Sequence, residues 1–283
     1  MYYGWRSFPP PLPQPAPDTG CTGSALGSAR GSGAARERVR SANATSATTI
    51  AWSDANEGPG MNALGTPLMR RLLDELVAAA DAPILLRGAG KAFSAGLDLK
   101  EVASLDEPGM QAFLELLEAL IVRLFNHPAP VVAAVNGHAI AGGAVLALCC
   151  DAAHGTDSDR ARVGLNEVAL GLQFPPAVLA AVRHRLDPRQ QGEVLLGARL
   201  HRPADACRLG LVDTLSADPV ASAKAHLDKL AAHPPAAYAT TKAALRGGVT
   251  DVDADDRRRF LEEVVPVWNS EETKARLLAI LGR

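Results

Sequence analysis

Short apolar runs rich in β-branched residues recur along the chain from residue 48 onward. They cover residues 48–53, 84–86 and 131–135, and each has the length of a buried strand. Glycines follow the second run, and the turn pair Asn136-Gly137 closes the third. Longer segments between the runs carry apolar residues at helical spacing. Strands that alternate with helices predict an α/β fold with crossover units around a parallel sheet.

Two amphipathic helices are predicted between these strands. The first begins at Thr66-Pro67, where we expect Thr66 as the N-cap and Pro67 as the first helical residue. The second covers residues 108–125, and two prolines follow it. A further apolar segment at 139–150 is shorter than the roughly 18–20 residues of a bilayer-spanning helix. It contains two glycines, and we expect a buried helix there.

Helical spacing dominates the chain after about residue 175. The predicted C-terminal helices cover residues 176–186, 188–196, 203–209, 219–232, 235–246, 254–265 and 271–281. The pattern therefore predicts three regions. These are a leader at 1–45, an α/β core with the active site at 46–190 and a helical C-terminal region at 191–283.

The leader differs in composition from the rest of the chain. Residues 1–45 are rich in Pro, Gly, Ser, Ala and Arg and show neither a helical nor a strand period. Such a segment buries too little apolar surface to offset its ordering entropy, so we expect it to be disordered. Its five arginines against Asp18 and Glu37 weakly resemble an organellar transit peptide. A start codon assigned too far upstream is an equal alternative.

Charge and cysteine usage narrow the function classes. The net charge of −2 gives no indication of a nucleic-acid or membrane-surface partner. The four cysteines, Cys21, Cys149, Cys150 and Cys207, form no CxxC pair, so zinc and thioredoxin signatures are absent from the sequence. We expect buried free thiols at Cys149 and Cys150, no metal and a reducing compartment. The cytoplasm is the expected location, with the mitochondrial or peroxisomal matrix as the alternative.

Three segments have residue patterns suited to chemistry. Residues 91–99 place small residues and a glycine after a strand, where a backbone can approach a ligand. In residues 136–144 a strand and turn lead into two glycines and an apolar helix, whose free N–H groups would favour a developing negative charge. In residues 163–171, Glu167 is one acid among apolar residues, where its pKa is expected to rise. Each segment alone could equally be a tight loop, a glycine-eased helix start or a solvated glutamate.

Together the three segments resemble the crotonase (enoyl-CoA hydratase/isomerase) superfamily over about residues 50–245. FSAGLDL, NGxAxAGG and GLNE match family motifs, and Asn62-Ala63-Leu64 adds a match to the loop near coenzyme A. The resemblance implies a crotonase-like (ClpP/crotonase) spiral of ββα units whose helical C-terminal part mediates trimer packing and covers the active site. It implies an acyl-CoA thioester substrate, no separate cofactor, and a homotrimer or dimer of trimers.

The resemblance also assigns roles to individual residues. The thioester oxygen would be held by the backbone N–H groups of Leu97 and Gly142, which would stabilise an enolate. Glu167 would be the catalytic acid and base. The residues expected to contact coenzyme A or substrate are Ala63, Leu64, Ala95, Gly96, Asp98, Gly143, Val145 and Phe174.

One position departs from the hydratase pattern. Hydratases of this family use two glutamates, and the position of the other glutamate is Val145 here. Asp151, the next acid downstream, matches a structural aspartate of the family. One carboxylate can take a proton from C2 and return it at C4, so the sequence favours a 3-enoyl-CoA to 2-enoyl-CoA isomerase. Val145 would also make the pocket drier.

Other functions stay open at this point. The same fold hosts hydration, dehydration, decarboxylation and thioester hydrolysis of acyl-CoA compounds. A non-catalytic acyl-CoA binder is a second alternative. Lys242 and Arg257-Arg258-Arg259 are basic candidates for coenzyme A phosphates, although a solvated helix face also explains the arginines. The sequence leaves open the acyl chain that is bound, since its pocket floor, including Phe174 and the 108–125 helix, is formed by tertiary structure.

Overall fold

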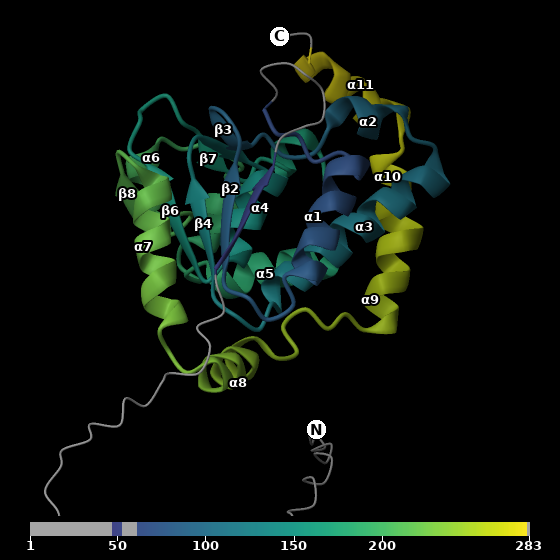
Figure 1. Cartoon of the computed structure of the whole chain (residues 1–283). Helices are drawn as coiled ribbons and strands as arrows, with labels where there is room; N and C mark the ends of the chain where they lie inside the picture. Colours follow the sequence, from purple (N-terminus) through teal and green to yellow (C-terminus); the bar gives the residue numbers. More distant parts are fainter. Residues whose placement is uncertain (1–46, 53–60, 282–283) are drawn as a thin grey trace, which may run out of the picture. The chain divides into compact units, whose positions relative to one another are not determined.

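Five parallel strands form the central sheet of this protein. A computed structural model describes residues 47–52 and 61–281, which belong to one compact unit spanning residues 42–283. The predicted leader at 1–45 and Ser53, the last residue of the first predicted strand, lie outside the described residues. The sheet has the strand order β1-β2-β4-β6-β8 (Figure 1). Its strands are β1 (Thr48–Trp52), β2 (Ile84–Gly88), β4 (Val131–Val135), β6 (Ala152–Thr156) and β8 (Thr214–Ser216).

A smaller sheet has the order β3-β5-β7 and is also parallel. Its strands are β3 (Ala92–Ser94), β5 (His138–Ile140) and β7 (Val163–Gly164). Each strand of the small sheet follows a strand of the large one, which gives the successive ββα units predicted from the family resemblance. The sequence predicted one helix at 139–150, but Ala139 and Ile140 are in β5, and α4 (Gly142–Cys149) begins only after them. Ala141 separates the strand from the helix, and the first two residues of the helix are glycines.

Helices cover both faces of the large sheet. The helices of the α/β core are α1 (Thr66–Ala78), α2 (Leu99–Ser104), α3 (Glu107–Phe125), α4, the 3₁₀ turn η1 (Val168–Leu170) and α5 (Pro176–Arg185). Apolar residues of α1, α3 and α4 pack with one face of the sheet in the main core. On the other face, Ala223 and Leu227 of α7 (Pro219–Ala231) pack against Leu85, Val132 and Ala134. Because both faces are covered, strands such as β4 are buried throughout.

The C-terminal region is helical, as predicted, apart from β8. Its helical elements are α6 (Pro203–Arg208), α7, α8 (Pro235–Arg246), α9 (Ala254–Arg259), α10 (Val265–Trp268) and α11 (Glu271–Leu281). Two π-helical turns, η2 (Gly192–Leu196) and η3 (Phe260–Val264), replace parts of the predicted helices at 188–196 and 254–265. Strand β8 pairs with β6, so the sheet extends beyond the boundary expected at residue 190.

The start of α1 differs in detail from the prediction. Gly65 occupies the N-cap position, and Thr66 is the first helical residue. The Thr66 N–H donates a hydrogen bond to Glu101 Oε2 of α2 at 2.9 Å. A carboxylate from another helix therefore takes the part expected of the Thr66 hydroxyl, and a carboxylate at this end is also favoured by the helix dipole.

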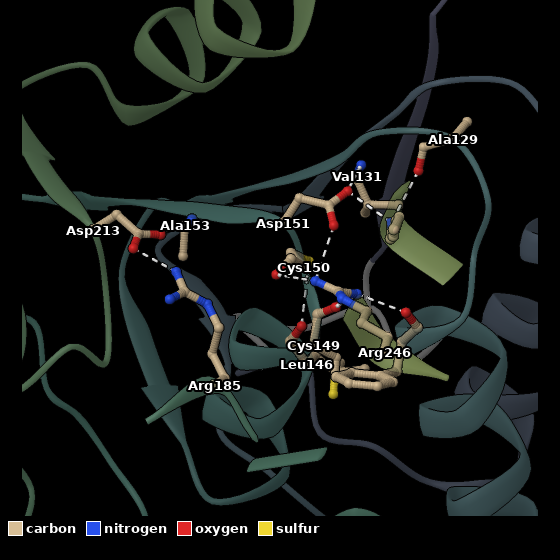
Figure 2. Close-up of polar contacts among 12 residues, drawn as sticks. Ala129, Val131, Leu146, Cys149, Cys150, Asp151, Ala153, Arg185, Asp213 and Arg246 are labelled. Carbon is tan, nitrogen blue, oxygen red and sulfur yellow. Dashed lines mark hydrogen bonds and ion pairs between the residues drawn. The ribbon is translucent and has the colours of Figure 1, made fainter. Parts of the chain in front are cut away.

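Asp151 connects α8 to the sheet (Figure 2). Its carboxylate pairs with Lys242 Nζ at 2.7 Å and Arg246 Nη2 at 2.9 Å, and it accepts a bond from the Val131 N–H at 2.7 Å. Lys242 and Arg246 are the buried residues of α8. Polar contacts rather than an apolar face therefore hold this helix in place, and the structural role expected of Asp151 has a physical basis.

Among the described helices, none combines the length and apolar character that crossing a bilayer requires.

Candidate active site

A cavity of about 590 Å³ brings the three sequence segments together. It lies between the small sheet, the start of α4 and the C-terminal helices α10 and α11. Of the predicted site residues, the cavity is lined by Ala63, Ala95, Leu97, Asp98, Gly142, Val145, Glu167 and Phe174. Leu64, Gly96 and Gly143 do not line it.

The backbone N–H of Leu97 is free to meet a ligand. Leu64 N donates to Gly96 O at 2.7 Å, and Asp98 N donates to Leu64 O at 3.2 Å. In a parallel bridge of this kind, the middle residue uses neither of its own backbone groups for the pairing. The Leu97 N–H therefore has no hydrogen-bond acceptor among the described residues, while the residues on both sides are fixed.

Gly142 supplies a second free N–H beside the first. It is the first residue of α4, so its N–H has no partner within the helix, and none elsewhere in the described part of the chain. A Cβ added to Gly96 would lie only 3.4 Å from Gly142 N, which places the two segments in direct contact. The N-cap residue Ala141 has φ 49° and ψ −121°, a strained backbone for a residue with a side chain. The strain lies at the turn that presents Gly142.

Glu167 is held in an apolar environment. It is 7% exposed and directly precedes η1, and its Oε2 has no hydrogen-bond partner among the described residues. Burial raises the pKa of this carboxyl from 4.5 to about 7, and hydrogen bonds from nearby backbone N–H groups only partly oppose the shift. Its backbone oxygen accepts bonds from the N–H groups of Leu170 and Leu172, both at 2.9 Å, which fix the turn. A carboxyl with a pKa near neutrality can both accept and return a proton.

The remaining charged groups around the cavity do not duplicate this function. Asp98 is the N-cap of α2, and its Oδ1 accepts bonds from Lys100 N at 3.0 Å and Glu101 N at 3.2 Å. Val145 lines the cavity from the first turn of α4 and is 2% exposed. Within the described residues, Glu167 is thus the one lining carboxyl that has a buried oxygen without a hydrogen-bond partner.

Asn62 holds the loop of the fourth sequence match against β3. It is 1% exposed, and its side-chain amide donates to Ala89 O at 2.9 Å and Ala92 O at 2.8 Å. The Ser94 hydroxyl in turn donates to Asn62 O at 2.8 Å. These bonds fix Leu64 where it pairs with Leu97. Gly143 has a comparable packing role, since a Cβ there would lie 2.4 Å from Ser94 O.

The floor of the cavity includes residues that the sequence analysis did not identify. Phe174 and Leu117 of α3 line it as expected. Trp268 also lines it, and its indole N–H donates to Gln173 O at 3.1 Å. Ile280 and Leu281 of α11 complete the wall. No local pattern marks these residues, because they lie 90 or more positions after Phe174 in the sequence and reach the cavity only through the fold.

The other candidates lie outside this cavity. Lys242 lines a separate cavity and forms an ion pair with Asp151, so it does not lie beside Glu167. Arg257 pairs with the buried Glu118 of α3 at 2.8 Å. Cys149 and Cys150 are buried free thiols, as predicted, whereas Cys21 lies outside the described residues. Within the described part of the chain, no cluster of three His, Cys, Asp or Glu residues could hold a metal ion.

Known proteins are similar to this chain in both sequence and fold. The family model for enoyl-CoA hydratase/isomerase matches residues 54–274. A Thermus thermophilus protein named as a candidate enoyl-CoA hydratase is 37% identical over 169 residues, which cover 57% of this chain and 65% of that protein. The mouse mitochondrial enoyl-CoA delta isomerase 1 is 31% identical, and the match covers 56% of each chain. The chain thus spans less than two thirds of the length of these two relatives.

Solved structures support the same fold. The crystal structure of human mitochondrial delta3-delta2-enoyl-CoA isomerase aligns with a TM-score of 0.77 and 24% identity, and the alignment covers 84% of this chain and 93% of that one. The family model covers most of the chain, including all three segments around the cavity. The chain therefore belongs to the enoyl-CoA hydratase/isomerase family, the crotonase superfamily, and has its fold.

Proposed function

We propose that this protein is an enoyl-CoA isomerase that converts a 3-enoyl-CoA into a 2-enoyl-CoA. Glu167 carries the proposal, because it is a buried carboxyl with a pKa of about 7 that lines an apolar cavity beside two free N–H groups. The substrate is an acyl-CoA thioester, and coenzyme A enters as part of it. No separate cofactor takes part in the proposed chemistry.

The proton shift uses one carboxylate in two steps. The Glu167 carboxylate removes a proton from C2, and the electrons of that C–H bond pass into a dienolate whose negative charge lies on the thioester oxygen. The protonated Glu167 then returns the proton to C4, and the double bond moves from C3–C4 to C2–C3. The carboxylate is regenerated, so neither water nor a second acid is consumed.

In this proposal, the free N–H groups of Leu97 and Gly142 receive the thioester oxygen. Donors that are fixed before the reaction stabilise a developing oxyanion without reorganisation, and one such donor contributes about 2.7–4 kcal/mol in other enzymes. The hydrogen bonds on either side of Leu97 and the helix start at Gly142 supply this rigidity.

Val145 favours isomerisation over hydration. A hydratase of this family needs a second carboxylate to activate water, and a buried aliphatic side chain stands at that position. The wall around Glu167 is otherwise formed largely by apolar residues, including Leu170, Leu172 and Phe174. Such a wall limits water access and protects the dienolate.

Hydration is the second candidate function. It is supported by the 37% identity to the Thermus thermophilus relative, which is named for a hydratase activity. The two reactions are separated by assaying the same purified protein with 3-enoyl-CoA and with crotonyl-CoA. Double-bond transfer with little hydration supports isomerisation, and the reverse result supports a hydratase.

The decisive variant is Glu167→Gln, which keeps the shape of the side chain and removes its basicity. Loss of isomerisation with retained acyl-CoA binding is the expected result. Full activity of this variant would overturn the assignment, and binding without turnover by the native protein on any enoyl-CoA would favour a non-catalytic binder. A homotrimer or dimer of trimers, expected from the family, is the proposed assembly.

A further inference from the structure

We propose that Arg276 of α11 is a positioning residue that holds the Glu167 turn in place, a role that rests on the proposed function of Glu167. Its guanidinium Nη1 donates to Leu170 O at 3.0 Å, and its Nη2 pairs with Glu272 at 2.7 Å. Leu170 is the last residue of η1, which starts directly after Glu167. The C-terminal helix is therefore hydrogen-bonded to the turn that carries the proposed catalytic base.

The residue after Leu170 leaves room for the contact with Arg276. Gly171 follows Leu170 with φ +74°, and a Cβ added there would lie 2.0 Å from Arg276 Nη1. Any larger residue at this position would displace the guanidinium. Glycine suits this position in two ways, because it adopts the left-handed backbone that ends η1 and leaves room for the close approach of Arg276.

The turn transmits this constraint to Glu167 through a short path. Leu170 N and Leu172 N both bond to the Glu167 carbonyl oxygen at 2.9 Å. Holding the Leu170 carbonyl from outside fixes the peptide units that close around Glu167. Arg276 itself does not line the cavity, so it acts through the turn rather than on the substrate.

The same helix also closes the cavity. Ile280 and Leu281 line its wall, and Ile280 lies one helical turn beyond Arg276. Helix α11 packs on α2, which begins just after Leu97 (Figure 1). One helix therefore contacts the elements that follow both Leu97 and Glu167, and Arg276 is its polar link to the second of them.

Removing the hydrogen bond between Arg276 and Leu170 O is expected to loosen the turn and let water reach Glu167. The carboxyl is buried, and the charged side chains that line its cavity, Asp98 and Lys100, do not contribute to its pKa shift. Hydration of the turn would therefore lower the pKa of Glu167 toward its ordinary value. In Arg276→Met, kcat for isomerisation should fall roughly 10-fold to 10²-fold, since small misplacements of a base are costly, while KM changes little.

The test measures Glu167 directly. Proteins labelled with ¹³C at the glutamate carboxyl are titrated by NMR, and Glu167→Gln identifies the Glu167 resonance. Arg276→Met and Gly171→Ala are both expected to lower the pKa of Glu167 and kcat. Arg276→Lys, which keeps one donor for Leu170 O, should restore part of both.

Glu272→Gln is the matched control, because it removes the ion pair of Arg276 but leaves the Leu170 contact. Its titration and kcat should equal those of the native protein. An unchanged Glu167 titration and kcat in folded Arg276→Met and Gly171→Ala would overturn the positioning role. If the titration shifts but the native protein isomerises no enoyl-CoA, the proposed function fails and the structural coupling stands.

Discussion

Val145, which the family resemblance aligns with the other glutamate of the hydratases, lies on the wall of the same cavity as the Glu167 carboxyl. Both side chains are buried, at 2% and 7% exposed. The pair consists of one carboxyl and one aliphatic group, and this contrast is the basis for proposing proton transfer within the substrate rather than addition of water.

The first prediction concerns the base itself. Glu167→Gln should lower kcat for 3-enoyl-CoA isomerisation by at least about 10²-fold. This is the lower end of the rate enhancement that a general acid or base usually contributes. Binding of a non-reactive acyl-CoA should persist, because the Leu97 and Gly142 N–H groups are unchanged. Steady-state kinetics and calorimetric titration measure the two quantities. If acyl-CoA binding weakened by the same factor as kcat, the loss of activity would point to a misfolded pocket instead.

The second prediction concerns pH. The pKa of Glu167 is about 7 in the folded protein and returns to its ordinary 4.5 on unfolding. The native state thus binds this proton more tightly, so its contribution is fully present below pH 4.5 and is lost as pH rises through 7. The loss amounts to about 3 kcal/mol in the free energy of unfolding.

Glu167→Gln cannot ionise and should escape this loss. Denaturant unfolding of both proteins at pH 5 and pH 8 should show the native protein losing stability relative to the variant as pH rises. In parallel, native kcat/KM should increase across pH 7 as the free base forms. Identical pH dependence of unfolding in the two proteins would contradict a raised pKa.

The third prediction tests the contact between the two N–H segments. In Gly96→Ala, the new Cβ would lie 2.7 Å from Ile140 O, at a backbone φ of +89° that disfavours any side chain. The two segments must separate, so kcat should fall by roughly 10²–10³-fold, as when one oxyanion donor is lost.

Gly90→Ala is the matched control. Gly90 also has a positive φ, of +68°, but a Cβ there meets nothing within 4 Å. This variant should share the backbone strain and keep native kcat. Comparable losses of kcat in both variants would attribute the effect to strain alone.

The fourth prediction asks whether one residue separates the two reactions. Val145→Glu should lower isomerisation by about 10²-fold, since a second buried carboxyl raises the pKa of Glu167 further and admits water. Hydration of crotonyl-CoA should become measurable. Val145→Gln, which has the same shape without charge, should show no hydration. Absence of hydration in Val145→Glu would mean that water needs further positioning groups.

The fifth prediction concerns the ion pairs that anchor α8. Asp151→Asn leaves Lys242 and Arg246 buried without their shared anion and should reduce stability by about 3–5 kcal/mol. The exposed pair Lys224–Asp228 provides the comparison, since Asp228→Asn should cost at most about 1 kcal/mol. Chemical denaturation measures both values, and equal costs would show that burial of the Asp151 cluster is unimportant.

Local sequence determined the strands and helices with a regular period. Residues 131–135 form β4 with the predicted bounds, because burial on both faces leaves a direct pattern. The helices α8 and α11 also match their predicted ranges. The short strands β3, β5 and β7 were not predicted, since two or three residues are too few to show a period. Pairing with neighbouring strands, rather than local propensity, makes Ala139 and Ile140 a strand.

The sequence by itself also identified the segments that carry Leu97, Gly142 and Glu167, because small residues and an isolated acid leave a visible pattern. Only the tertiary structure decided which N–H groups are free, since that depends on the bridge between Leu64 and Leu97. It likewise placed Trp268 in the wall of the cavity and Arg276 against the turn that follows Glu167. Contacts between residues about 100 positions apart in the chain follow from packing and leave no local signal.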